Sequence, residues 1–171
     1  MAKSRKKSRT HVRINDDALP NVPRSFVVKT GKVSNNIAEL VQDIRRTMQP
    51  NTASRLKERK TNKLRDFVHV ASQLHVTHLI LLSKTVNGPL MRMARLPHGP
   101  TLTFSLDSFS LRKDILALQN RPVSDGIASK YAPLVILNHF AAFATKPENI
   151  HLKLMTTMFQ NMFPSIDVQT V

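Results

Sequence analysis

Short apolar runs and residues with helical spacing alternate through the first half of the chain. Residues 25–30 and 78–83 predict strands, and the second run is apolar enough to be a central strand buried on both faces. Ser34 can cap a helix whose apolar residues recur every three or four positions as far as Pro50. The same spacing predicts another helix over residues 62–74. The expected order is therefore strand, helix, helix, strand.

A turn motif divides the next apolar segment in two. Residues 97–100 read Pro-His-Gly-Pro, which makes a continued helix very unfavourable. The flanking residues 90–96 and 101–106 are therefore expected to form an antiparallel pair of strands. A further helix is predicted over residues 110–120, with its apolar residues on one face.

The order strand then helix recurs near the end of the sequence. Residues 134–138 are expected to form a strand and residues 147–163 a helix that ends, like the first, at a proline. A new extended segment would start at Pro164. The recurrence hints at an internal duplication whose second unit is incomplete in this sequence.

Positive charge is concentrated in the first part of the chain. The whole sequence has 26 Lys and Arg against 11 Asp and Glu, a formal charge of +15 with a pI near 11.0. Residues 1–65 hold 17 of these cations against 5 acids, or +12, whereas residues 66–171 carry only +3. A localised excess of this size favours nucleic acid as the partner.

The densest cationic segment runs directly into the helix predicted over residues 62–74. Its six cations are Arg55, Lys57, Arg59, Lys60, Lys63 and Arg65. Positive charge at a helix N-terminus opposes the helix dipole, whereas phosphate groups there would suit both the cations and the helix end. The alternative is a solvated face partly neutralised by Glu58 and Asp66.

Two further groups of residues are candidates for RNA contact. The polar arm of residues 1–24 contains Lys3, Arg5, Lys6, Lys7 and Arg9, and such runs serve as nucleic-acid arms or nuclear localisation signals, or are simply solvated. Arg92, Arg95 and His98 around the predicted turn could extend the basic surface or pair with an acidic protein. With no Trp and one Tyr, phosphate and shape recognition is expected rather than base stacking.

Other chemistry has little support in the sequence. His75 and His78 lie close together, but no Cys or carboxylate cluster completes a zinc site. The four glycines form neither a phosphate-binding loop nor a nucleophile elbow. The longest apolar stretches are too short to cross a bilayer. We therefore expect no enzyme activity, no metal or cofactor, no small-molecule substrate and no membrane partner, in a soluble intracellular protein.

Four segments together resemble the Brix-domain family of ribosome biogenesis proteins, and within it the Peter Pan subgroup. They are residues 52–60 (TASRLKERK), 76–84 (VTHLILLSK), 92–104 (RMARLPHGPTLTF) and 158–166 (MFQNMFPSI). The resemblance implies an α/β fold of two similar strand-helix halves, related to anticodon-binding domains. It divides the chain into the arm at residues 1–24, a first half at 25–110, and a linking helix with a partial second half at 111–171.

The resemblance also implies a non-catalytic assembly factor of the large ribosomal subunit in the nucleus and nucleolus. Its implied partners are precursor ribosomal RNA, other assembly factors and ribosomal proteins. The alternative is chiefly a protein-interaction module in the pre-ribosome, with an apolar edge that docks a partner and charge used for nucleolar retention.

Overall fold

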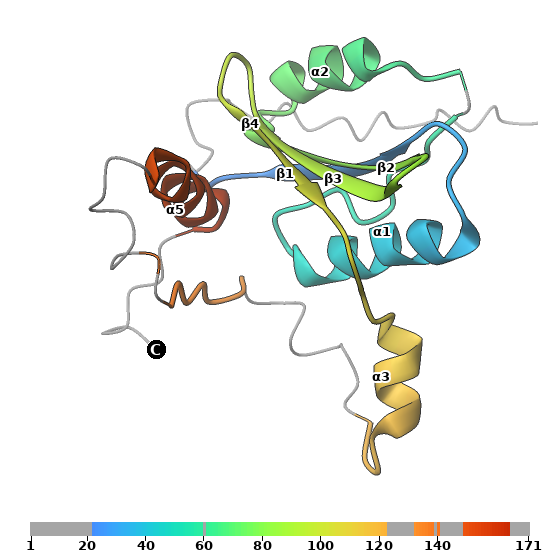
Figure 1. Ribbon diagram of the computed structural model, residues 1–171. Coiled ribbons are helices and arrows are strands. Elements are labelled where there is room, and N and C mark those ends of the chain that lie inside the picture. Colours follow the sequence, from blue (N-terminus) through green and yellow to red (C-terminus); the bar gives the residue numbers. More distant parts are fainter. Residues whose placement is uncertain (1–21, 60, 123–131, 139, 141–148, 165–171) are drawn as a thin grey trace, which may run out of the picture.

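A four-stranded mixed sheet forms the centre of the computed structural model, which describes residues 22–59, 61–122, 132–138, 140 and 149–164 (Figure 1). The elements in chain order are β1 (Ser25–Thr30), α1 (Asn35–Thr47), α2 (Leu64–Gln73), β2 (His78–Thr85), β3 (Gly88–Arg95), β4 (Thr101–Ser105), α3 (Arg112–Leu118) and α5 (Ile150–Met162). The cationic arm at residues 1–21, Lys60 and the extended segment after Pro164 lie outside the described residues.

The strands lie in the order β1-β2-β3-β4. β1 pairs with β2 in parallel, with Val27 opposite Ile80. β2 to β3 and β3 to β4 are antiparallel, as the sequence predicts for the strands around residues 97–100. The central position of β2 is also confirmed, because five of its eight residues, starting at His78, are buried.

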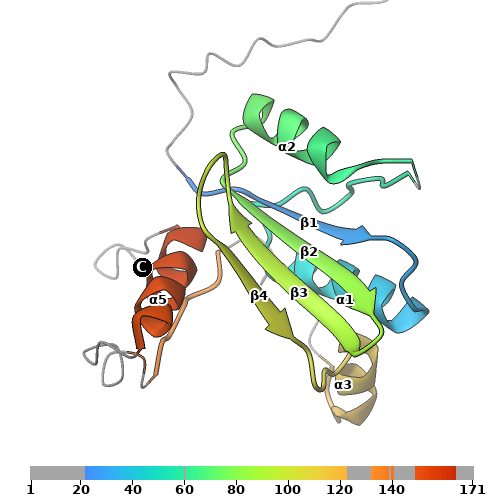
Figure 2. The ribbon, with the colours of Figure 1, turned by 45° about the horizontal axis from the view of Figure 1, so that its top comes forward.

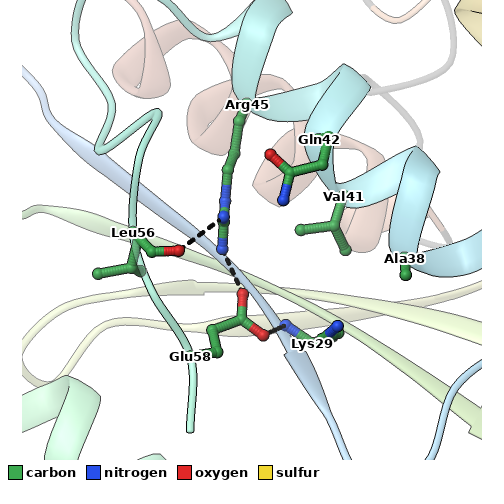
Figure 3. A pocket seen from close by; sticks show the side chains of 7 residues that line it. All are labelled: Lys29, Ala38, Val41, Gln42, Arg45, Leu56 and Glu58. Carbon is green, nitrogen blue, oxygen red and sulfur yellow. Dashed lines mark hydrogen bonds and ion pairs between the residues drawn. The ribbon is translucent and has the colours of Figure 1, made fainter.

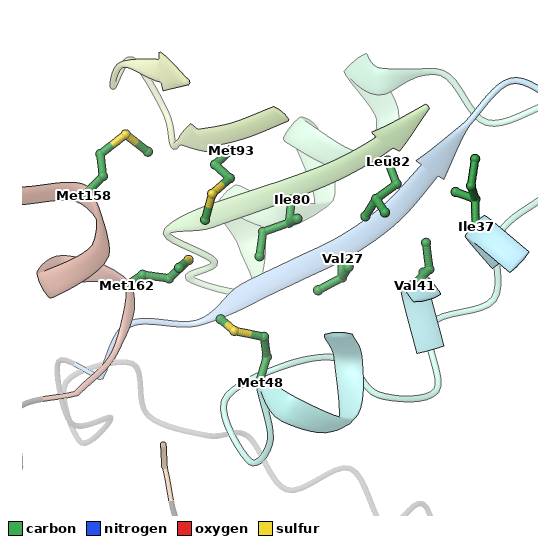
Figure 4. Close-up of a cluster of buried hydrophobic side chains, with 9 residues drawn as sticks. All are labelled: Val27, Ile37, Val41, Met48, Ile80, Leu82, Met93, Met158 and Met162. Atoms are coloured by element: carbon green, nitrogen blue, oxygen red, sulfur yellow. The ribbon is translucent and has the colours of Figure 1, made fainter. Parts of the chain in front are cut away.

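Helices cover both faces of the sheet, because the strands carry apolar side chains on both sides (Figures 1 and 2). On one face, residues of β1, β2 and β3 pack against α1 and α5 in the cluster drawn in Figure 4: Val27, Ile37, Val41, Met48, Ile80, Leu82, Met93, Met158 and Met162. On the other face, Phe67 and Ala71 of α2 pack against the alternate strand residues, Phe26, Val28, Leu79 and Leu81. Leu79, Leu82, Val27, Val28 and Val41 have 0 or 1% of their surface exposed.

The predicted helices are present, with ends that differ by up to three residues. Ser34 caps α1 as predicted, since its hydroxyl accepts a hydrogen bond from the Ile37 N–H at 3.5 Å. α2, α3 and α5 lie within the segments 62–74, 110–120 and 147–163 that the apolar spacing predicts. None of the helices in the described part of the chain has the length and apolar character needed to cross a membrane.

The strand predicted over residues 134–138 is wrong. Residues 132–138 have neither strand nor helix, and Leu134 and Ile136 are 67% and 72% exposed. An apolar run forms a strand only where a neighbouring strand can pair with its backbone, and no described strand pairs with this segment. α5 therefore lacks the companion strand of the expected second unit, so the described residues do not show two similar halves.

Candidate nucleic-acid interface

The cationic strip, which we define as residues 55–65, begins in a turn and then runs beside the edge strand β1. Along its first five residues exposure alternates. Arg55, Lys57 and Arg59 are exposed, whereas Leu56 and Glu58 are partly buried. This alternation puts successive side chains on opposite sides of the segment, as an extended chain does. The strip therefore presents three cations to solvent and turns its apolar and acidic side chains toward the protein.

A buried arginine of α1 fastens this segment (Figure 3). Arg45 is 2% exposed, and its guanidinium donates from Nε and Nη2 to the Val27 carbonyl at 2.9 and 2.7 Å. It also donates from Nη1 to the Leu56 carbonyl at 2.9 Å and forms an ion pair with Glu58. The second carboxylate oxygen of Glu58 accepts from the Lys29 N–H at 3.3 Å. α1, β1 and the strip are thus joined through one guanidinium.

The residues that precede the strip also form hydrogen bonds with the backbone of β1. The Ser25 N–H donates to the Asn51 carbonyl at 2.9 Å, and the Thr52 hydroxyl donates to the Ser25 carbonyl at 3.0 Å. Edge strands otherwise present unpaired backbone groups that invite association. Here the segment leading into the strip, and the strip itself, take up those groups, so the strip is held at several points along β1.

The end of the strip forms the start of α2. Lys63 and Arg65 are exposed there, and the Asp66 carboxylate accepts from the Lys63 N–H at 2.9 Å. Asp66 thereby offsets part of the unfavourable charge at this helix end. Glu58, by contrast, is committed to the buried Arg45. Of the two acids that could neutralise these cations, only Asp66 therefore acts at the start of α2.

Three lysines that the sequence pattern did not single out are exposed near the same end of the sheet. Lys29 is the next-to-last residue of β1, Lys32 follows that strand, and Lys84 is the next-to-last residue of β2. Because β1 and β2 are parallel, their carboxyl ends meet at one edge, beside the first residues of α2 (Figures 1 and 2). In the sequence, this grouping could have been found from the lysines near the ends of the two predicted strands, Lys29 and Lys84. In α/β folds this edge is where ligands commonly bind.

Arg92, Arg95 and His98 lie elsewhere. Arg95 and His98 are at the β3–β4 turn, at the opposite end of the sheet from the start of α2 (Figure 2). At about 3.3 Å per residue, the length of β2 separates these ends by roughly 25 Å. Arg92 pairs with Leu81 and so shares the sheet face that α2 covers in part. The structure therefore places Arg95 and His98 away from the end of the strip that starts α2, and the contact of all three residues with RNA stays a prediction.

One member of the histidine pair, His78, is a buried side chain at the start of β2. His78 is 3% exposed, and burial together with the nearby charge of Arg95 lowers its pKa to about 4, so the imidazole is neutral at pH 7. Its Nδ1 lies 2.8 Å from the Thr77 hydroxyl, while its Nε2 has no hydrogen-bond partner among the residues that the structure describes. Within the described ranges no three His, Cys, Asp or Glu residues are grouped so that they could hold a metal ion.

These features define an α/β domain with a row of exposed cations held beside the edge strand β1. A protein-family model, described as the Brix domain, matches residues 30–171 of the chain. That match spans most of the sequence, and the chain therefore belongs to the Brix-domain family, as the resemblance of its four segments indicates.

Named relatives agree with this assignment. The chain is 41% identical over 171 residues to a Brix domain-containing protein of Schizosaccharomyces pombe, covering 99% of this chain and 44% of the relative. It is 44% identical over 150 residues to the Peter Pan-like protein of Arabidopsis thaliana, covering 88% and 42%. It is 39% identical over 180 residues to ribosome biogenesis protein SSF2 of Saccharomyces cerevisiae, covering 98% and 39%. The chain thus spans less than half the length of each of these relatives.

Proposed function

We propose that this protein is a non-catalytic assembly factor of the large ribosomal subunit that binds precursor ribosomal RNA through the cationic strip and the lysines beside it. The observation that carries the proposal is the fixed alternation along the strip: Arg55, Lys57 and Arg59 face solvent because Glu58 is bound to the buried Arg45. A preorganised row of cations loses less conformational entropy on binding phosphates than a mobile tail does.

The charge distribution supports a phosphate backbone as the ligand. The strip contributes Lys63 and Arg65 at the start of α2, and Lys29, Lys32 and Lys84 are exposed near the same end of the sheet. Contacts to phosphate give affinity and position without reading sequence. Ribosomal RNA is proposed because yeast relatives are named ribosome biogenesis proteins. Localisation in the nucleus and nucleolus, and contact with other assembly factors and ribosomal proteins, belong to the same proposal.

A second candidate function has its own observation. On α2, Leu64, Val70 and Leu74 at its boundary are 47%, 42% and 50% exposed. Exposed apolar side chains on one helix can mark a protein-docking surface. The protein would then act chiefly as an interaction module in the pre-ribosome, with its charge used for retention in the nucleolus.

Salt dependence separates these functions. If strip and flanking lysines neutralise about six phosphates, the logarithm of the affinity for single-stranded RNA falls with the logarithm of salt concentration at a slope of roughly −4. Replacing Arg59 and Lys63 by Ala should flatten that slope by about 1.4, because two phosphate contacts are lost. Fluorescence anisotropy with an RNA strand of about 12 nucleotides gives both values.

A charge-matched variant provides the control. Arg121 and Lys153 are also exposed cations, but they lie outside the strip, after α3 and in α5. Their replacement by Ala removes the same net charge and should leave the slope close to the wild-type value. Binding that is indifferent to salt, or equal effects of the two double variants, would contradict the proposal.

A further inference from the structure

Thr61 interrupts the row of cations in the strip. Every second residue from 55 to 65 is Arg, Lys, Arg, Thr, Lys and Arg in turn, so cations lie two and four residues from Thr61 on each side. Thr61 is also the only residue of the strip with a hydroxyl group. A negative charge added to this side chain would therefore fall within the row.

The Thr61 hydroxyl is exposed and has no structural task among the described residues. Thr61 lies in a turn in which the Asn62 N–H donates to the Arg59 carbonyl at 3.0 Å. A threonine before a helix often caps it, but the N-cap of α2 is Lys63, and the Lys63 N–H donates to the Asp66 carboxylate. The Thr61 side chain forms no hydrogen bond within the part of the chain that the structure describes. A chemical change at this hydroxyl therefore breaks no contact seen in the fold.

The surroundings of Thr61 suit an enzyme with an acidic substrate-binding surface. Lys57, Arg59, Lys63 and Arg65 are all exposed. The nearest acid in the sequence, Glu58, is paired with the buried arginine of α1. Complementary charge favours the matching partner, and protein kinases select substrates by such charge patterns. The segment therefore fits a kinase whose substrate groove is lined with carboxylates.

We propose that Thr61 is a phosphorylation site, and that a phosphate on Thr61 weakens the hold of the strip on RNA. A protein kinase that recognises basic segments transfers the γ-phosphoryl group of ATP to the Thr61 Oγ1. The bond from this phosphorus to the ADP oxygen breaks, the Oγ1–P bond forms, and the hydroxyl proton passes to the catalytic aspartate of the kinase. The inference rests on the proposed RNA binding and adds its regulation.

The new phosphate competes with RNA for the same cations. It carries a charge of about −1.5 to −2 near neutral pH and three strong acceptor oxygens. Of the described cations, Arg59 and Lys63 are nearest to Thr61 in the sequence, and such groups form charge-assisted hydrogen bonds with phosphate. If these two no longer contact RNA, the salt slope flattens by about 1.4, and the affinity at about 0.1 M salt falls roughly 25-fold.

Phosphopeptide analysis tests whether the site is used. The full-length protein is isolated from growing cells and digested with a protease that cleaves after Glu and Asp, which releases residues 59–66 as one peptide. Mass spectrometry should find phosphate on Thr61, and Arg59→Ala with Lys63→Ala should reduce it because the kinase loses its recognition charges. A peptide found only without phosphate, or one phosphorylated equally in the double variant, would overturn the proposal.

Fluorescence anisotropy with an RNA strand of about 12 nucleotides measures the effect on binding. The full-length protein with phosphothreonine at position 61 should bind roughly 25-fold more weakly than the unmodified protein at about 0.1 M salt, with the flatter slope. Phosphothreonine at position 157, an exposed threonine of α5, adds the same charge outside the strip and should leave binding unchanged. Thr61→Val removes the hydroxyl but no cation, and it should also bind like the unmodified protein.

The outcomes separate this inference from the proposed function. Equal binding with and without phosphate at position 61, or an equal loss in Thr61→Val, overturns the regulation but not the RNA-binding proposal. An equal loss with phosphate at position 157 overturns it too, because net charge and not the strip would then be responsible. Binding of the unmodified protein that is indifferent to salt overturns both.

Discussion

Removing Glu58 should destabilise the fold far more than its place on the surface suggests. The Arg45 side chain is 3% exposed and that of Glu58 is 11% exposed, so Glu58→Ala leaves a buried guanidinium without its countercharge. Breaking a buried pair by removing one partner costs about 3–5 kcal/mol. Since Val27 and Leu56 keep their hydrogen bonds to Arg45, we expect the lower end, about 3 kcal/mol.

Urea denaturation at pH 7, followed by far-ultraviolet circular dichroism, measures this change. Glu39→Ala is the matched control, because Glu39 pairs with Lys113 through side chains that are 46% and 60% exposed, and its removal should leave the midpoint unchanged. The double variant Arg45→Met with Glu58→Leu should lose less stability than the two single changes together, because no unpaired charge remains. A loss below about 1 kcal/mol for Glu58→Ala would refute the idea that this pair fastens the strip.

Three further predictions concern single positions. Because the pKa of His78 is lowered from 6.5 to about 4, the unfolded chain takes up a proton between these pH values that the folded chain does not. The free energy of unfolding should therefore fall by up to about 3 kcal/mol as pH drops from 6.5 to 4. Urea denaturation across this range should show a smaller fall in His78→Leu, and an equal fall in the two proteins would contradict the prediction. Asp66→Ala should lower the free energy of unfolding by about 1 kcal/mol and speed amide hydrogen exchange in the first turn of α2, since it removes the hydrogen bond from the Lys63 N–H. An unchanged exchange rate would argue against this cap. Gly99→Ala should destabilise the protein by about 1–3 kcal/mol in urea denaturation, because the new Cβ of Ala would lie 2.5 Å from the Arg95 Cβ. An unchanged free energy of unfolding would mean that the turn shifts freely.

The elements whose signals are local could be predicted from the sequence. The run from Leu79 to Leu82 is apolar at successive positions and short, which favours a strand covered on both faces, and this is where β2 lies. Ser34 and Pro50 mark the limits of α1 because capping and proline act on neighbouring residues. The strand predicted at 134–138 failed because an apolar run does not reveal whether a partner strand is available.

The anchoring of the strip depends on contacts that no local pattern shows. Arg45 lies in the last turn of α1, where a cation is usually a solvated partner of the helix dipole, yet it is buried and bonded to Val27 and Leu56. Its ion pair with Glu58 spans 13 residues of sequence. The grouping of Lys29 with Lys84 could have been found, because two parallel strands that each carry a lysine next to their last residue bring those cations to one end of the sheet.

The most direct test of the central claim is ultraviolet cross-linking of the full-length protein to RNA in cells, followed by mass spectrometry of the cross-linked peptides. We predict that peptides from residues 55–65 carry precursor ribosomal RNA of the large subunit. Arg59→Ala with Lys63→Ala should reduce those adducts, whereas Arg121→Ala with Lys153→Ala should not. Cross-links that avoid residues 55–65 and remain unchanged in both variants would contradict the claim that the strip binds RNA.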